Sequence, residues 1–321
     1  MTNSFALIEN TFGFVRIHFA NLVDFIRKQT NRTFVVTTDG KFCWCFPHCY
    51  GNTIWDFHNN IPPSCREGIR MARENGHLAF LCTGRARGFV TSEDLLSIGF
   101  DGIVSGCGTM IEYRGEVLYQ RLIEKDLVIK TMEEARKYKV RPILEGPRHL
   151  YMDYEDFRDD RYGQKLMREM EDSLLSITDS WGQWEIVKLA CDLTGSDTGP
   201  FVEALSPWYD FIFHNDIVVE MVPKGFSKAT GIHKTCSLLG LDVSDTFAFG
   251  DGQNDMEMIK AAGCGIAMGN ATPALKEAAD YVTSSLDRDG IWNALCHFGL
   301  IPDARPILHE EDPGQGRYHL Y

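Results

Sequence analysis

Two carboxylates and an amide lie close together in the segment FAFGDGQNDMEMI. An apolar stretch ends at Phe249, a glycine turn leads to Asp251, and Asn254 and Asp255 open the following helical pattern. The apolar stretch predicts a buried strand, at whose end these three side chains converge. Mg²⁺ prefers oxygen ligands of this kind and keeps waters that a substrate phosphate can replace. Capping of the next helix is the alternative interpretation.

Two other segments place phosphate-binding groups at the ends of predicted elements. In LAFLCTGRARG a buried strand ends at Thr83, whose hydroxyl and following backbone N–H groups can bind a phosphate oxygen, although helix capping is again the alternative. In MVPKGFSKATGI, Lys228 begins a helix, where a cation opposes the helix dipole. We therefore interpret Lys228 as a ligand for a bound anion, with Lys224 in the preceding turn as its competitor.

Strands alternate with helices on both sides of the chain's middle. This alternation over residues 32–107 and 222–301 predicts an α/β fold, a Rossmann-like doubly wound core with a parallel sheet. Residues 108–221 differ, with a hairpin predicted to turn at Arg114-Gly115 and helices after it, so we expect an inserted α+β cap domain. The joint between such parts is where ligands bind.

The composition limits the partners and the cellular location that we expect for the protein. The 321 residues carry a formal charge of -13, which argues against nucleic acid or an anionic membrane as a partner. No apolar run reaches the roughly 18 residues of a membrane span, and the start lacks a signal peptide's pattern, so we expect a cytoplasmic protein with its 10 cysteines reduced. Residues 1–31 are an extension of uncertain role, and the Pro- and Gly-rich tail, 302–321, is expected to be loosely ordered. The oligomeric state is not predicted.

The motifs resemble those of a known family. Thr83-Gly84-Arg85, Lys228 and Gly250-Asp251-x-x-Asn254-Asp255 resemble, in this order, motifs two, three and four of the haloacid dehalogenase-like (HAD) phosphatases. The run GCGIAMGNATPALKEAADYVTSSLDRDGIWNALCHFGLI resembles the C-terminal part of the Cof-type group with a type IIB cap. The resemblance covers about residues 60–301. It implies Mg²⁺-dependent hydrolysis of a small phosphomonoester, such as a sugar phosphate.

The resemblance also implies a role for each site residue. An aspartate attacks phosphorus, a second aspartate two residues later acts as acid and base, and the cap selects the substrate. Carried over by position, Thr83 and Lys228 hold the phosphoryl group, and Asn254 orients the acidic pair. Substrate-binding residues are then Gly84, Arg85 and Asn254, and the Mg²⁺ ligands are Asp39, Asp251 and Asp255.

The first motif departs from the family pattern D-x-D-G-T, and two placements are open. In the first, the strand TFVV leads to TTDGK, with Asp39 as acid and base and Thr37 in the nucleophile's place. In the second, FCWCFPHCYGNTIWDFHNNIPPS puts His48 and Tyr50 at the two aspartates, with an extra Asn52 before Thr53. Its proline suits a central strand poorly. We prefer the first placement.

Threonine at position 37 raises a rival function, because an alcohol needs a general base before it can attack. The rival function is that of a catalytically inactive protein on the same fold, which binds a phosphate ligand or has a regulatory role. It is also open whether the N-terminal residues belong to a functional gene product.

Two smaller features have their own alternatives. Cys43, Cys45, His48 and Cys49 could bind a structural Zn²⁺, but their spacing is tighter than usual and favours a loop. In YMDYEDFRDDRY, Tyr151 or Asp153 could face substrate, although a solvated helix edge is the commoner meaning.

Overall fold

The computed structural model describes residues 5–10, 13–18, 33–37, 53–56, 59–158, 161–170, 173–214 and 216–303. Their strands form three sheets, one of eight strands, one of six and one of two. The two-stranded sheet is an antiparallel pair, β1 (Phe5–Asn10) with β2 (Gly13–His18). The predicted nucleophile position Thr37 ends a described strand, whereas Asp39, the Cys43–Cys49 cluster and the tail after 303 lie outside the described residues.

The eight-stranded sheet is the core, in the order β16-β15-β14-β3-β4-β5-β6-β7. Neighbouring strands from β16 to β5 are all parallel, as an alternation of strands and helices requires. The predicted α/β fold with a Rossmann-like core is confirmed. The parallel strands are β3 (Thr33–Thr37), β4 (Leu78–Cys82), β5 (Gly102–Ser105), β14 (Thr246–Gly250), β15 (Cys264–Ala267) and β16 (Tyr281–Val282).

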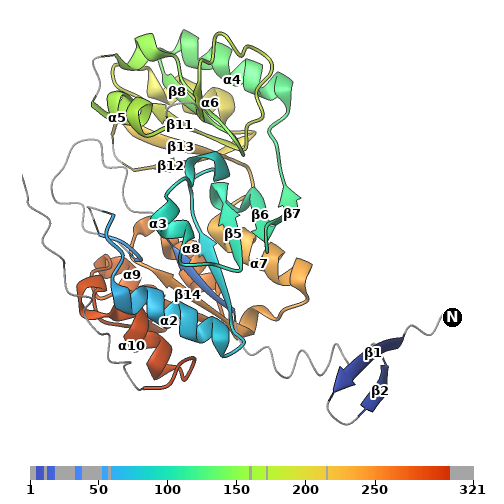
Figure 1. Cartoon of the computed structure of the whole chain (residues 1–321). Coiled ribbons are helices and arrows are strands. Elements are labelled where there is room, and N and C mark those ends of the chain that lie inside the picture. The colour runs from blue at the N-terminus through green and yellow to red at the C-terminus, as the bar shows by residue number, and fades with distance from the viewer. Residues whose placement is uncertain are drawn as a thin grey trace, which may run out of the picture.

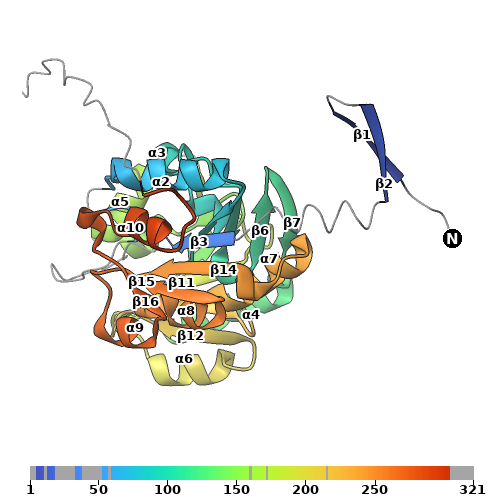
Figure 2. The same cartoon turned by 90° about the horizontal axis from the view of Figure 1, so that it is seen from below.

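Helices cover both faces of the core sheet. Figure 2 shows α2 and α10 on one side of β3 and β14 and α8 on the other, where α7 packs beside it. Both faces are therefore apolar, and Phe80 and Phe249 are fully buried. No helix of the described chain is long and apolar enough to cross a membrane. The core helices are α2 (Pro63–Glu74), α3 (Glu93–Leu96), α7 (Lys228–Leu239), α8 (Met256–Ala261), α9 (Pro273–Ala278) and α10 (Gly290–His297).

The six-stranded sheet belongs to a second unit, the cap. Its order is β10-β9-β8-β11-β13-β12, and Figure 1 shows α4 and α6 on the side of this sheet that faces away from the core. Alternate residues such as Leu144, Leu189 and Val219 are fully buried in one apolar cluster with these helices. The strands are β8 (Arg141–Glu145), β9 (Leu150–Tyr151), β10 (Leu174–Leu175), β11 (Lys188–Asp192), β12 (Tyr209–Phe213) and β13 (Val218–Pro223), and the helices are α4 (Lys125–Lys137), α5 (Arg161–Met170) and α6 (Thr198–Leu205).

The hairpin that we assigned to the insert belongs to the core sheet instead. Its strands β6 (Met110–Tyr113) and β7 (Glu116–Gln120) turn at Arg114-Gly115 as predicted, but β6 pairs antiparallel with β5. Gly106, Cys107 and Gly108 all have positive φ, of 57°, 55° and 85°, and reverse the chain directly after β5. The chain therefore enters the cap after β7, and not at residue 108.

Gly108 should tolerate a side chain poorly. A Cβ there would lie 2.7 Å from the Ser227 carbonyl oxygen and 2.9 Å from the Gly231 Cα at the start of α7. We expect Gly108→Ala to lower the free energy of unfolding by about 3 kcal/mol, from strained backbone plus overpacking. Gly115→Ala is the matched control, because Gly115 has a φ of 83° but no described atom within 4 Å of the added Cβ, and should cost about 1 kcal/mol. Urea unfolding measures both, and equal losses would contradict this account.

Candidate active site

The predicted site residues follow strands that end at one edge of the core sheet. β14 ends before Asp251 and β4 ends before Thr83, and β3 lies between them and ends at Thr37. Because these strands are parallel, their carboxyl ends share an edge. This backbone arrangement brings Asp251, Thr83 and position 37 to the same side of the sheet.

Asp255 organises the turn after β14. One carboxylate oxygen, Oδ2, accepts hydrogen bonds from the backbone N–H groups of Asp251 and Gly252, at 2.9 and 3.0 Å. The other, Oδ1, accepts one from Lys228 Nζ at 2.6 Å. A Cβ at Gly250 would lie within 2.7 Å of the Asp255 side chain, so glycine is needed before Asp251. Asp255 therefore shapes the turn that presents Asp251.

Lys228 is the first residue of α7 and is only 3% exposed. The cation that opposes the helix dipole is thus balanced by the Asp255 carboxylate, which is 1% exposed. The competitor Lys224 is exposed and donates to the Ser206 carbonyl oxygen at 2.8 Å. Of the two lysines, Lys228 is the one that lies beside the acidic pair.

Thr53 was not among our candidate site residues, yet the structure brings it to the site. Its hydroxyl donates a short hydrogen bond to Asp251 Oδ1, and both side chains are buried. The signal for it was in the second placement of the first motif, where Thr53 falls on the motif's threonine after one extra residue. We preferred the first placement for its apolar strand and its Asp-Gly, and because the proline of the second suits a central strand poorly.

The turn after β4 is held by backbone hydrogen bonds from the left-handed segment 106–108. Gly106 N–H donates to the Arg85 carbonyl oxygen at 2.7 Å, and Cys107 N–H donates to that of Thr83 at 3.2 Å. Arg85 N–H donates to Thr83 Oγ1 at 3.1 Å. The next helical segment begins at Arg87 with Ala86 as its N-cap, so Thr83 does not cap a helix. Its buried hydroxyl instead supports the shape of the turn.

The remaining substrate-binding candidates flank this turn. The Arg85 guanidinium lies 5.5 Å from the Trp55 ring centre and 5.2 Å from that of Phe89, within cation–π range. Since Trp55 follows Thr53 closely, this contact joins the Thr53 segment to the Thr83 turn. Asn254 lies against Gly252, where an added Cβ would come within 2.6 Å of its Oδ1. Gly84 is buried within the turn.

The described oxygen ligands suit Mg²⁺ in type. Asp251 and Asp255 both lie at the sheet edge, but Asp255 already accepts three hydrogen bonds, of roughly four that a carboxylate can accept. No group of three His, Cys, Asp or Glu side chains that could hold a metal occurs within the described ranges, and Asp39 is outside them. Asp251 is thus the described residue best placed as a ligand, and Asp255 as the residue that orients it.

Neither candidate from the cap's aromatic and acidic stretch faces the core site. Tyr151 is 5% exposed and packs in the cap's apolar cluster. Both carboxylate oxygens of Asp153 accept hydrogen bonds from within the cap, Oδ1 from Thr178 N–H at 3.0 Å and Oδ2 from Thr178 Oγ1 at 2.8 Å. Both residues therefore have structural contacts inside the cap.

A family model described as haloacid dehalogenase-like hydrolase matches residues 51–295. The chain belongs to the haloacid dehalogenase-like hydrolases. The match, together with the likeness to the subclass IIB structure below, confirms the predicted HAD membership of Cof type. It begins after Thr37 and Asp39, so neither predicted residue of the first motif lies within it.

Relatives cover most of the chain. The "Putative phosphatase YkrA" of Bacillus subtilis (strain 168) is 31% identical over 267 residues, which are 78% of this chain and 95% of that protein. The solved structure of BT4131, a HAD subclass IIB sugar phosphatase, is 25% identical, with a TM-score of 0.68 over 84% of this chain and all of its own. BT1666 from Bacteroides thetaiotaomicron, a HAD-superfamily phosphatase, is 25% identical with a TM-score of 0.69, over 85% of this chain and 97% of its own.

The Thr53 hydrogen bond should be important for stability. Thr53→Val keeps the side chain's shape but removes the donor to Asp251, leaving a buried carboxylate oxygen without it. We expect the free energy of unfolding to fall by about 1–3 kcal/mol. Thr91→Val is the matched control on an exposed threonine and should change it by less than about 0.5 kcal/mol. Chemical denaturation of the two variants side by side checks this, and a Thr53→Val loss no larger than the control's would rule the contact out as a stabilising one.

Proposed function

We propose that this protein is a Mg²⁺-dependent phosphatase that hydrolyses a small phosphomonoester such as a sugar phosphate. The observation that carries the proposal is the buried Lys228–Asp255 pair, which presents Asp251 and a cation together at the sheet edge that Thr83 shares. The names of the relatives, a phosphatase and a sugar phosphatase, support the same reaction and substrate class.

The residues would divide the work in the following way. The Thr83 hydroxyl would bind a phosphoryl oxygen, and Lys228 would neutralise the charge of the phosphoryl group in a site shielded from water. Mg²⁺, held by Asp251 and Asp39 with Asp255 orienting Asp251, would supply further positive charge to the phosphoryl oxygens. Asp39 would take a proton from the attacking group and return it to the leaving oxygen. Thr37 stands where the attacking carboxylate belongs, and its hydroxyl would have to lose a proton first.

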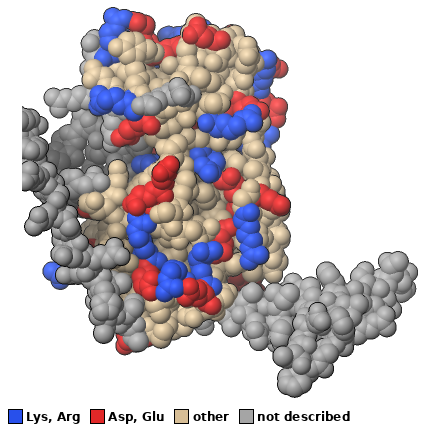
Figure 3. Space-filling model, viewed as in Figure 1, with Lys and Arg blue, Asp and Glu red and all other residues tan. Residues whose placement is uncertain are grey.

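Recognition of the anion would be local. On the face drawn in Figure 3, Lys and Arg side chains are interspersed with Asp and Glu, and the formal charge of the chain is -13. A phosphate group would therefore be attracted by Lys228 and the Thr83 turn, and not by a general basic surface.

The second candidate function is an inactive protein that binds a phosphorylated ligand. Threonine at position 37 favours it, as does a family match that begins only at residue 51. In this case the phosphate-binding groups would be kept while turnover is lost. Loss of a nucleophile costs several powers of ten in rate, at about 1.4 kcal/mol for each.

Lys228→Ala should abolish the binding of inorganic phosphate or orthovanadate. The change removes the cation and leaves Asp255 as a buried, uncompensated charge, so we expect affinity to fall by at least about 100-fold. Lys224→Ala, on an exposed lysine four residues earlier, is the matched control and should bind like the unaltered protein. Calorimetric titration measures affinity, with circular dichroism to confirm folding. Unchanged binding of phosphate or orthovanadate by folded Lys228→Ala would contradict the assignment of Lys228 to the phosphate site.

Turnover decides between the two functions. We expect Thr37→Asp to release phosphate from a panel of sugar phosphates at least about 1,000-fold faster than the unaltered protein, because a carboxylate attacks without a separate base. EDTA should stop the release. Slow release by the unaltered protein would support the phosphatase, and release by Thr37→Asp alone would support the inactive protein. An unaltered protein that is already fully active would mean that another group attacks phosphorus.

A further inference from the structure

The turn that carries Thr83 is held from two sides. Its carbonyl oxygens accept hydrogen bonds from the core segment 106–108. Its N–H groups need acceptors as well, and the Ala86 N–H finds one outside the core. It donates at 3.1 Å to Oε2 of Glu145, the last residue of β8 in the cap. A side chain of the cap thus completes the hydrogen bonding of a turn in the core.

The Ala86 N–H lies out of reach of solvent. Ala86 is fully buried, and Glu145 is 4% exposed. A buried N–H without an acceptor costs free energy, so loss of the Glu145 carboxylate would favour a different backbone conformation at Ala86. Ala86 lies three residues after Thr83, and between them Arg85 N–H donates to Thr83 Oγ1 at 3.1 Å. A shift of the backbone at Ala86 would therefore move the hydroxyl that we expect to bind phosphate.

Backbone contacts on both sides of Glu145 fix its place against the core. Gly88 N–H donates to the Gly146 carbonyl oxygen at 3.2 Å, and Val187 N–H donates to that of Glu145 at 2.9 Å. A Cβ at Gly146 would lie 2.3 Å from the Glu185 carbonyl oxygen, so glycine is needed directly after Glu145. The end of β8 is therefore docked on the core by its backbone, and the Glu145 side chain extends into the contact.

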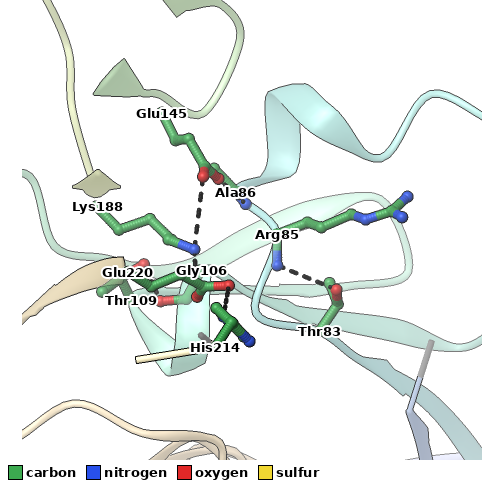
Figure 4. A network of polar contacts seen from close by, with 9 residues as sticks. All are labelled: Thr83, Arg85, Ala86, Gly106, Thr109, Glu145, Lys188, His214 and Glu220. Carbon is green, nitrogen blue, oxygen red and sulfur yellow. Dashed lines mark hydrogen bonds and ion pairs between the residues drawn. The ribbon is translucent and has the colours of Figure 1, made fainter. Parts of the chain in front are cut away.

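Lys188 orients the other carboxylate oxygen of Glu145. Figure 4 shows this carboxylate between the Ala86 N–H and the Lys188 ammonium, which lies 3.5 Å from Oε1. Lys188 also lies 2.5 Å from Glu220, which the His214 ring contacts at 2.8 Å. Burial would lower the pKa of Lys188, but the two carboxylates outweigh it and raise that pKa, so Lys188 remains a cation. A carboxylate at position 145 thus meets one donor at each of its two oxygens.

We propose that Glu145 is a positioning residue for the phosphate site, which holds the turn that carries Thr83 in the conformation that binds phosphate. The proposal rests on the proposed function, because it takes the phosphoryl group to lie at Thr83. Glu145 acts through one hydrogen bond to the backbone N–H of Ala86, and not through a contact with phosphate. The cap therefore contributes to phosphate binding by shaping a turn of the core.

Glu145→Ala tests the proposal, with inorganic phosphate as the probe and calorimetric titration of the full chain as the measurement. The substitution removes the acceptor of the Ala86 N–H but leaves Lys188 paired with Glu220. We expect the affinity for inorganic phosphate to fall at least about tenfold, the effect of one lost hydrogen bond to a charged group. Inorganic phosphate has no leaving group, so this affinity would not change if Glu145 only contacted the rest of a substrate. Glu145→Leu removes the same acceptor but fills its space, and it should show the same loss where Glu145→Ala does not fold.

Ala86→Pro provides a rescue that is specific to the hydrogen bond. Ala86 has a φ of -62°, which a proline ring holds, and proline has no N–H that needs an acceptor. In the double variant with Glu145→Ala, the ring takes space that the Glu145 carboxylate has left. We expect the phosphate affinity of this double variant to return to within about threefold of that of the unaltered protein. Glu203→Ala, on an exposed glutamate of α6 in the cap, is the matched control and should bind phosphate like the unaltered protein.

Urea unfolding of the same variants separates positioning from a purely structural role. If Glu145→Ala or Glu145→Leu is less stable but, when folded, binds phosphate like the unaltered protein, Glu145 only stabilises the cap, and the proposal is overturned while the phosphate site stands. A loss of affinity that Ala86→Pro does not restore, in a double variant that circular dichroism shows to be folded, also overturns it. If the unaltered protein does not bind inorganic phosphate, the proposed function fails, and the positioning role fails with it.

Discussion

The buried ion pair between Lys228 and Asp255 is the contact on which the site depends. It joins the first residue of α7 to the turn after β14, two elements that are apart in the chain. Burying two charges is costly, and the cost is offset only where further hydrogen bonds complete the pair. Asp255 receives them from the Asp251 and Gly252 N–H groups. The N–H groups that stabilise the buried Asp255 carboxylate are therefore the same ones that fix the position of Asp251.

A second cluster of buried charges lies in the cap and contacts the turn that carries Thr83. Glu145 reaches from β8 to the Ala86 N–H, and Gly88 N–H donates to the Gly146 carbonyl oxygen at 3.2 Å. A Cβ at Gly88 would lie 2.8 Å from the Arg148 backbone, so this approach requires glycine. Lys188 in turn forms buried ion pairs with Glu145 and Glu220 in the cap sheet. The turn that carries Thr83 is thus held by the core on one side and by the cap on the other.

The parts of the site that lie near one another in sequence were predictable, and the parts that depend on long-range contacts were not. The strand–turn–helix around Asp251 and the helix start at Lys228 follow from local pattern. The hairpin 110–120 was assigned to the cap because nothing local distinguishes a hairpin of one sheet from that of another; three residues with positive φ decide it. The cluster of Lys188, Glu145 and Glu220 could not be predicted for the same reason. Its members come from different strands and are brought together only by the register of the strands.

The two placements of the first motif need not exclude each other. The strand of the first, Thr33–Thr37, lies between β14 and β4, where its carboxyl end meets Asp251 and Thr83. The threonine of the second, Thr53, donates to Asp251, and Trp55 lies over Arg85. In the usual pattern D-x-D-G-T one short segment would supply both the strand end and the threonine. Here two segments separated in the chain supply them, so the strand that would carry a nucleophile and the contact that steadies Asp251 can be lost or kept independently.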